Sequence, residues 1–170
     1  SSIGNEDDDK QISNGAPRTV HVLHNSEQPA AVFSLLESPG PPPKTVPLVA
    51  DGLFDLLMLK MAGMYASKKQ TRMEARGPRF ELADFLIKIG NVTMSQNFKG
   101  VLVEVEYRPC LVPASCWDLL REFLQGFLGS CVQSTPPPYL QNRMNETYQP
   151  LDTIHQYLEQ FTSYRKIAGL

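Results

Sequence analysis

The sequence predicts an α+β fold in which an antiparallel β-sheet is covered by helices. Several short apolar runs alternate with period two, and two runs near the end of the chain have helical spacing. The predicted order is two strands, a strand and a helix, several further strands, and then two helices. Helices gathered against an antiparallel sheet in this way are typical of α+β domains.

The first strands form a predicted hairpin. Residues Thr19–Leu23 and Ala31–Leu36 have strand-like composition, and Asn25 marks a turn between them. Five prolines lie between residues 38 and 47. Proline lacks a backbone donor and favours extended polyproline conformation, so we predict an insertion loop there, followed by a short strand at Leu48–Ala50.

The clearest strand pattern lies between residues 80 and 107. Apolar residues alternate through Phe80–Leu82, Phe85–Ile89 and Val92–Met94, and the connection 95–100 then leads to the most regular strand. That strand places one set of side chains on each face: Val101, Val103, Val105 and Tyr107 against Leu102, Glu104, Glu106 and Arg108. The pattern predicts an antiparallel hairpin with the first set on the core and the second set in solvent.

Three helices are predicted. Residues 52–65 are apolar on nearly all sides, which is typical of a buried helix, and Asp51 suits its N-cap. A capping-box pattern from Ser115 to Asp118 begins the second helix, and Gly129 suits its end. The third runs from Asp152 to Lys166. The apolar stripes of the last two helices contain Trp117, Leu120, Leu124, Phe127 and Leu128, with Phe123 beside them, and Ile154, Tyr157, Leu158, Phe161 and Tyr164.

These elements give one domain with four parts. Residues 1–17 are a polar, acidic leader that we expect to be disordered, and residues 18–131 form the sheet and helix core. Residues 132–150 are rich in proline and uncharged polar residues, so we predict a flexible tether. Residues 151–170 form the last amphipathic helix of the same domain.

Charge and composition exclude several classes of protein. The first 18 residues hold four of the 18 acidic and two of the 16 basic side chains, which leaves 14 of each in the rest. A balanced body lacks the basic footprint of a nucleic-acid binder, so no direct specific DNA binding is expected. No apolar run approaches the roughly 20 residues that span a bilayer, and no secretory signal is visible, so no membrane association is expected.

Cysteine and histidine give little sign of reactive or metal chemistry. Cys110, Cys116 and Cys131 match no common zinc spacing, and we interpret them as small buried hydrophobic residues in a reducing compartment. The histidines are His21, His24 and His155, and the first two fall three positions apart on a strand. The sequence therefore predicts no metal site and no cofactor.

A series of short blocks, taken together, resembles the subunit 20 family of the Mediator coactivator complex, whose members are also called TRF-proximal proteins. No block is specific alone, but their order and spacing are specific over residues 20–166. The blocks are His24–Glu27, Leu48–Asp51, Phe54–Met58, Glu74–Gly77, Asp84–Gly90, Val92–Met94, Val103–Tyr107, Cys116–Trp117, Glu122–Gln125, Phe127–Ser130, Gln156–Tyr157 and Glu159–Phe161.

The resemblance implies an antiparallel, barrel-like sheet packed with helices and a non-catalytic role in the nucleus. It implies a heterodimer with the similarly folded subunit 18, which forms a mobile lobe of the head module and binds a helix of subunit 8. It also implies contact with other head-module subunits and, indirectly, with RNA polymerase II. The family passes signals from bound activators to the polymerase and its initiation factors.

One departure from the family pattern concerns the beginning of the chain. Members usually have a strand, a long helix and a strand before the block that starts at His24, and a short acidic leader stands there in this sequence. We therefore expect either an incomplete barrel or a shortened product or isoform. An opened sheet would expose unpaired edge groups.

Glu104-x-Glu106-x-Arg108 supports an enzymatic alternative. Two carboxylates and a cation on one face of a strand are suited to a divalent metal and a phosphate, and the spacing resembles that of triphosphate tunnel metalloenzymes. Such an enzyme needs a second acidic pair and further inward cations. The nearby candidates do not supply that pair: Glu74, Arg76, Arg79 and Glu81. We therefore favour a plain polar strand face.

Two candidate partner surfaces remain open. Five cations, Lys68, Lys69, Arg72, Arg76 and Arg79, form either a solvated loop or a contact for nucleic acid or for the acidic tail of a partner. The aromatic side chains of Tyr157, Phe161 and Tyr164 either pack back on the sheet or dock in another subunit, because aromatic anchors are common at interfaces. Trp117, Phe123 and Phe127 are expected to be core residues.

Overall fold

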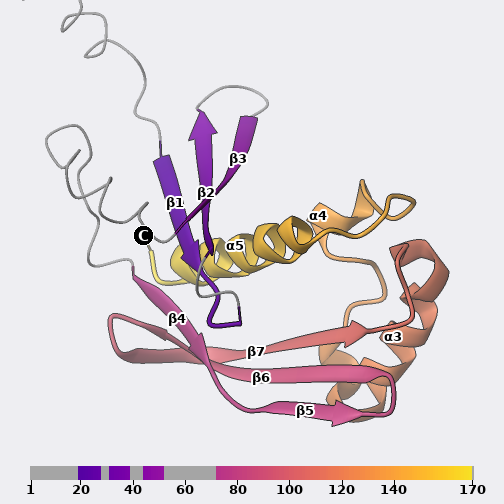
Figure 1. Ribbon diagram of the computed structural model, residues 1–170. Helices are drawn as coiled ribbons and strands as arrows, with labels where there is room; N and C mark the ends of the chain where they lie inside the picture. Colours follow the sequence, from indigo (N-terminus) through magenta and orange to yellow (C-terminus); the bar gives the residue numbers. More distant parts are fainter. Residues whose placement is uncertain (1–18, 28–30, 39–43, 52–71, 170) are drawn as a thin grey trace, which may run out of the picture. The chain divides into compact units, whose positions relative to one another are not determined.

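The computed structural model describes residues 19–27, 31–38, 44–51 and 72–169 (Figure 1). The chain divides into two compact units, residues 1–65 and 66–170. Each unit has its own antiparallel sheet, and the described part of the second also has helices, so the predicted α+β class is confirmed. The described strands form two separate open sheets and are not closed into a barrel. The acidic leader, the predicted helix 52–65, Lys68 and Lys69 lie outside the described residues.

The sheet of the first unit contains three strands in the order β1-β2-β3. β1 (Thr19–His24) and β2 (Ala31–Ser38) pair antiparallel, which confirms the predicted hairpin. β3 (Lys44–Asp51) pairs antiparallel with β2 and begins four residues earlier than predicted, with Pro47 opposite Leu35. A proline fits this position because β3 is an edge strand of that sheet and can leave one donor unused. Asp51 is the last residue of β3, and the helix that it was predicted to cap lies outside the described residues.

The sheet of the second unit is organised around β6 (Phe85–Met94). On one side, β6 pairs first with β5 (Arg79–Leu82) and then with β4 (Met73–Arg76). These two short strands follow each other along the same edge, and Gly77 and Pro78 join them. The amide of Ile89 donates to the carbonyl of Pro78 at 3.1 Å, which keeps the ladder connected across the join.

On its other side, β6 pairs with β7 (Asn97–Tyr107) over their full length, with one irregularity at Val92/Thr93. Ser95 and Gln96 alone connect the two strands, so the predicted six-residue connection is wrong. Both have positive φ, at 49° and 72°. Two such residues form a primed turn that matches the twist of a hairpin. The sequence prediction failed because the usual asparagine–glycine signal of this turn is missing.

Four helical segments complete the second unit: α3 (Pro113–Leu128), the 3₁₀ helix η2 (Gly129–Cys131), α4 (Pro138–Gln141) and α5 (Pro150–Ile167). α3 begins at Pro113 without a side-chain cap, so the predicted capping box at Ser115 is wrong. Proline suits a first helical position because the amide it lacks would have no partner there. Gly129 ends α3 with φ of 59°, as predicted. Asp152 belongs to a capping box with Gln149.

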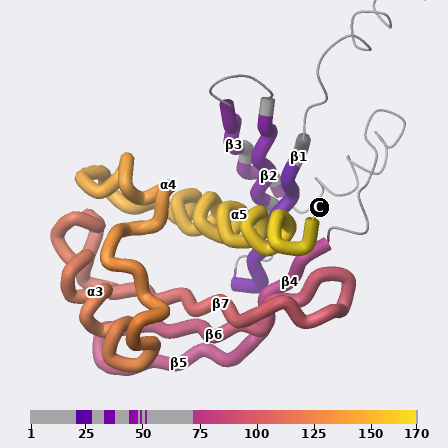
Figure 2. The backbone as a smooth tube through the Cα atoms, turned by 180° about the vertical axis from the view of Figure 1, so that it is seen from behind, coloured from indigo at the N-terminus to yellow at the C-terminus, as the bar shows by residue number. Residues whose placement is uncertain are grey.

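The two faces of this sheet carry different helices. Figures 1 and 2 show α5 running beside β7, and α3 lying near the end of β7. Phe123 of α3 stacks on Phe85 at 4.0 Å, on the face that also contains Tyr107. α5 contacts the face of Glu104, as described below. The prediction that this polar face lies in solvent is therefore wrong at Glu104, where a helix with polar and aromatic side chains covers it, whereas Glu106 is exposed.

The predicted tether contains α4 and joins the helices through backbone hydrogen bonds. The amide of Ala114 donates to Met144 and the amide of Tyr148 donates to Leu111, each at 2.8 Å. The beginning of α3 is thus bonded to the segment that leads into α5.

The interpretation of the three cysteines as small buried hydrophobic residues is wrong, because only Cys116 among them is buried and two of them are bonded to each other. Cys110 and Cys116 form a disulfide across the turn between β7 and α3, with their Cα atoms 6.3 Å apart. Cys131 is free and exposed. The sequence prediction relied on the usual state of thiols in a reducing compartment and had no information on their distance.

A substitution at Gly77 tests how closely the chain after β4 passes β6. A Cβ atom there would lie 1.7 Å from the carbonyl oxygen of Ile89, so Gly77→Ala must displace the ladder. We expect a loss of about 3 kcal/mol or more in the free energy of unfolding, measured by urea denaturation. Gly126→Ala is the control, because nothing lies within 4 Å of its added Cβ. Alanine at this helical position should stabilise by about 0.5–1 kcal/mol, and equal effects at the two sites would contradict the close approach.

Candidate interaction surface

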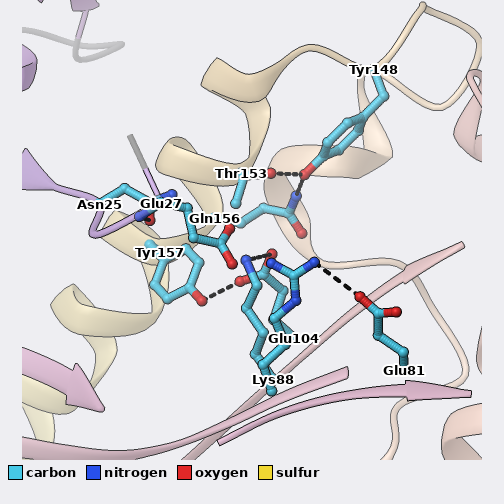
Figure 3. A network of polar contacts seen from close by, with 10 residues as sticks. Asn25, Glu27, Glu81, Lys88, Glu104, Tyr148, Thr153, Gln156 and Tyr157 are labelled. Atoms are coloured by element: carbon cyan, nitrogen blue, oxygen red, sulfur yellow. Dashed lines mark hydrogen bonds and ion pairs between the residues drawn. The ribbon is translucent and has the colours of Figure 1, made fainter. Parts of the chain in front are cut away.

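Two tyrosines of α5 fasten the helix to β7. The hydroxyl of Tyr157 donates a hydrogen bond to the Glu104 carboxylate, as Figure 3 shows. The hydroxyl of Tyr164 donates to the carbonyl of Val101 at 3.3 Å, and its ring lies over Gly100, where a Cβ atom would be 2.7 Å from the hydroxyl. The missing side chain of Gly100 therefore makes room for the tyrosine.

The bond to Val101 places α5 at the outer edge of the sheet as well as over one face. Ile89 of β6 directs its amide to Pro78, away from β7. In an antiparallel ladder, every second residue of each strand turns its backbone amide and carbonyl away from the partner strand. The register places Val101 among these residues. Its carbonyl therefore belongs to the outer edge of β7. A helix placed there shields backbone groups that would otherwise be open to pairing with another chain.

Glu104 is held by groups of its own unit. Besides the bond from Tyr157, its carboxylate lies 3.5 Å from the ammonium nitrogen of Lys88, and its side chain is 22% exposed. Figure 3 shows these three side chains converging between β6, β7 and α5. Glu106 is exposed and lies on the same face. Glu104 therefore bonds α5 to the sheet, and the two acids of the motif lie in different surroundings.

Other acids near this strand are also paired with arginines. Glu81 lies 2.8 Å from Arg108 and 3.2 Å from Arg79, and hydrogen bonding from Arg108 lowers the pKa of Glu81. Glu74 lies 2.6 Å from Arg76. Among the described residues, no group of three or more histidine, cysteine or acidic side chains is arranged to hold a metal ion. Glu74 and Glu81, the acids that could have supplied a second pair, are therefore each bound to arginine.

A buried carboxylate, Asp152, fixes the beginning of α5. Its side chain accepts hydrogen bonds from the Gln149 amide at 2.7 Å and the Tyr139 hydroxyl at 2.8 Å. The Nε of Arg143 lies 2.8 Å from the same carboxylate, and Asp152 is only 3% exposed. Burial and the bond to Asp152 raise the pKa of Tyr139 to about 12. Sequence analysis took Asp152 only as a favourable charge at a helix start; Tyr139 and Arg143 gave no signal in the sequence.

A second polar chain continues along α5. The hydroxyls of Tyr148 and Thr153 lie 2.6 Å apart, and the amide of Gln156 donates to Tyr148 at 2.9 Å (Figure 3). Burial raises the pKa of Tyr148. These bonds join the segment before α5 to its first turns, so this end of the helix has a fixed position within its unit.

The opposite face of the sheet has exposed apolar side chains. Pairing places Leu82 beside Phe85, Phe80 beside Ile87, and Phe98 beside Thr93, all on the face that α3 reaches at one end. Phe98 is 64% exposed and Val101 is 49% exposed. We call this set the outer apolar surface: Phe80, Leu82, Phe98 and Val101, with Phe127 of α3. Exposed apolar groups gathered on one face indicate a contact surface for another protein.

No helix in the described ranges has the length and apolar character required to cross a membrane.

The predicted aromatic residues divide between the two faces. Tyr157 and Tyr164 contact β7, and the ring of Phe161 meets that of Tyr157 edge to face at 6.0 Å. Phe123 stacks on Phe85, Trp117 is half-buried, and Phe127 is exposed with its ring 5.5 Å from Phe123. Tyr157 and Tyr164 therefore attach to their own sheet, Phe161 contacts the Tyr157 ring, and the rings of α3 extend to the outer apolar surface.

The described members of the basic cluster lie beside acids on the sheet. Arg76 and Arg79 contact Glu74 and Glu81. Arg72 lines a shallow polar hollow of about 420 Å³ together with Glu74, Thr93, Ser95 and Gln96. This mixture of signs favours a solvated surface over a continuous basic patch.

Comparison with known proteins gives a consistent result. The family described as TATA-binding related factor (TRF) of subunit 20 of Mediator complex matches residues 3–162. A mosquito relative, Mediator of RNA polymerase II transcription subunit 20 of Aedes aegypti, is 64% identical over 161 residues, which cover 89% of this chain and 72% of the relative. The protein of that name from Drosophila melanogaster is 51% identical, covering 94% and 69%. The one from Homo sapiens is 46% identical, covering 90% and 71%.

Tyr157→Phe tests the attachment of α5 to β7. The substitution removes the hydroxyl that donates to Glu104 while it keeps the ring, so we expect the free energy of unfolding to fall by about 1.5–3 kcal/mol, as for bonds to charged groups. Tyr164→Phe removes a longer bond to a neutral carbonyl and should cost about 0.5–1 kcal/mol. Urea denaturation of both variants checks the order. A larger loss for Tyr164→Phe would contradict the assigned role of Glu104.

His155 predicts a pH dependence of stability. Its ring stacks on Tyr139 at 4.6 Å, and burial lowers the pKa of His155 below its usual 6.5. The folded state therefore holds this proton less tightly than the unfolded state. The folded state therefore has its full stability above the pKa that His155 has in the unfolded chain, and it loses stability as the pH falls below about 6.5. Thermal melts between pH 7.5 and 5 should show a smaller decrease for His155→Gln than for the parent chain; parallel curves would contradict the argument.

Proposed function

Because the chain belongs to the Mediator subunit 20 family, we propose that it is a non-catalytic subunit of the head module of the Mediator coactivator complex. It pairs there with subunit 18 and binds a helix of subunit 8. In the nucleus, the lobe that it forms with subunit 18 supports regulated transcription by RNA polymerase II through other head-module subunits. The protein contributes surface and shape to the assembly and carries out no turnover.

The observation that supports this proposal most directly is the outer apolar surface. Phe80, Leu82 and Phe98 have large exposed areas although they alternate with polar residues in a regular sheet. A solvent-facing sheet side normally has polar residues at these positions. Aromatic side chains on a rigid strand lose little conformational freedom on binding, so they are suitable anchors for a partner subunit.

The residues of the enzymatic alternative support a scaffold role instead. Glu104 would need a carboxylate open to a metal ion, and this carboxylate accepts a hydrogen bond from Tyr157 and lies beside Lys88. A metal ion would have to displace both groups and release α5 from β7. The strand motif is therefore better explained as an attachment point for a helix.

Only part of the aromatic stripe of α5 belongs to the proposed interface. Tyr157 and Tyr164 fix the helix through their hydroxyls, and Phe161 lies between them along the helix. We propose that Phe161 and the free sides of the two tyrosine rings contact a neighbouring subunit while the hydroxyls stay bound to β7. The interface then combines α5 with the outer apolar surface.

Phe98→Asp tests the role of the outer apolar surface. Phe98 is mostly exposed, so its replacement should leave the chain folded, and a carboxylate at an apolar contact should weaken binding of subunit 18 by about tenfold or more. Asn97→Asp is the matched control, because it makes the same charge change on the adjacent exposed residue of β7, on the opposite face. The affinity of the control for co-expressed, purified subunit 18 should stay within about twofold of the parent.

Two results would contradict the proposal. Failure of the parent chain to form a one-to-one complex with subunit 18 would exclude the heterodimer. Equal loss of affinity for the two aspartate variants would show that charge near the β6–β7 turn matters, and would move the interface away from the outer apolar surface.

A further inference from the structure

The disulfide between Cys110 and Cys116 lies at a junction of three elements. It bridges the turn that joins β7 to α3, and the amide of Cys110 also donates to Tyr107 at 3.1 Å. Within the same turn, Leu111 and Ala114 bond to the segment that leads into α5. A covalent bond made or broken here therefore acts where the sheet, α3 and the beginning of α5 are all attached.

The surroundings of the two sulfur atoms suit the reduced form as well as the oxidised form. Sγ of Cys110 lies 3.0 Å from the carbonyl of Val112, and Sγ of Cys116 lies 3.7 Å from the carbonyl of Pro113. Each thiol would thus have an acceptor without any rearrangement of the backbone. Pro109 and Pro113 restrict the turn on either side, so the two sulfur atoms stay close in both forms.

We propose that Cys110 and Cys116 form a reversible dithiol–disulfide switch that stiffens the corner between β7 and α3 when it is oxidised. The inference rests on the proposed function in one respect, the nuclear compartment. A bond of this kind in a reducing compartment is transient and responds to the thiol pool, whereas in a secreted protein it would be permanent.

The exposure of the two residues sets the order of the reaction. Cys116 is buried in the first turn of α3, where the helix dipole favours a thiolate, and Cys110 is more accessible. The Cys110 thiolate attacks a small disulfide such as oxidised glutathione and releases one glutathione thiolate. The Cys116 thiolate then attacks the Cys110 sulfur of the mixed disulfide and releases the second. Two protein thiols and one small disulfide thus give one protein disulfide and two small thiols, and excess thiol reverses the process.

The switch affects the surface through α3. Phe123 and Phe127 extend from this helix over Phe85 towards the outer apolar surface, and Cys116 lies two turns before Phe123. With the bond closed, the first turn of α3 is tied to the end of β7. With the bond open, only the hydrogen bonds of the turn hold it, so the aromatic side chains of α3 are less firmly positioned.

The test is a redox titration of the full chain with Cys131→Ser, which removes the exposed free thiol and leaves the pair intact. Samples equilibrated in mixtures of reduced and oxidised glutathione are alkylated, and mass spectrometry counts the protected cysteines. We expect a change from two free thiols to none within the range of mixtures found in cells. The disulfide form should melt at least about 3 °C higher, and amides in the first turn of α3 should exchange more slowly.

Cys110→Ser and Cys116→Ser, each in the same background, should remove the redox dependence of melting and exchange. If either variant fails to fold, the comparison of the parent with and without reductant still decides the question. A pair that stays reduced throughout, stays oxidised in millimolar thiol, or changes form with no change in melting or exchange would overturn the switch. The titration involves no partner, so failure to bind subunit 18 would affect only the proposed function.

Discussion

Strand β6 pairs with β7 on one side and with β5 and then β4 on the other, and the described part of the second unit is built on these pairings. The arrangement requires the chain to pass very close to Ile89 at Gly77, where any side chain would meet the backbone. With β6 fixed on both sides, the register decides which residues of β7 face α5 and which face α3. The positions of Glu104 and Phe98 both follow from that register.

The chain uses the two faces of this sheet differently from what hydrophobicity alone suggests. Val101 and Phe98 of β7 and Phe80 of β5 remain exposed on one face, and α5 contacts the other face at Glu104, beside Lys88. The polar face works as a helix attachment site because the Glu104 carboxylate accepts a hydrogen bond from Tyr157 across the contact and lies beside Lys88. The apolar face is the one that we propose for contact with another protein.

Among the described residues, sequence reasoning located the β6–β7 strands, α3 and α5 because their patterns are local. Alternation from Val101 to Tyr107 and helical spacing from Ile154 to Tyr164 depend on residues within a few positions of each other. It failed where the outcome depends on distant partners or on backbone strain: β3 accepts Pro47 because it is an edge strand, and Ser95 and Gln96 adopt positive φ without the usual turn residues. The bonds from Tyr157 to Glu104 and from Tyr139 to Asp152 join residues that no pattern pairs. For the interaction surface, the sequence supplied only Tyr157, Phe161 and Tyr164 of α5. Phe80 and Phe98 were not candidates, because only the register and their exposure single them out.

The turn between β7 and α3 connects the attachment of α5 with the outer apolar surface. The attachment of α5 begins with Asp152 and its partners, and the segment before it bonds back to Leu111 in the corner. The outer apolar surface ends at Phe127, on the helix that the same corner begins. A change in the stiffness of the turn therefore reaches the covered face through α5 and the exposed face through α3. The proposed switch would act on the proposed contact surface in this way, because it alters how firmly the contact residues are held without altering the residues themselves.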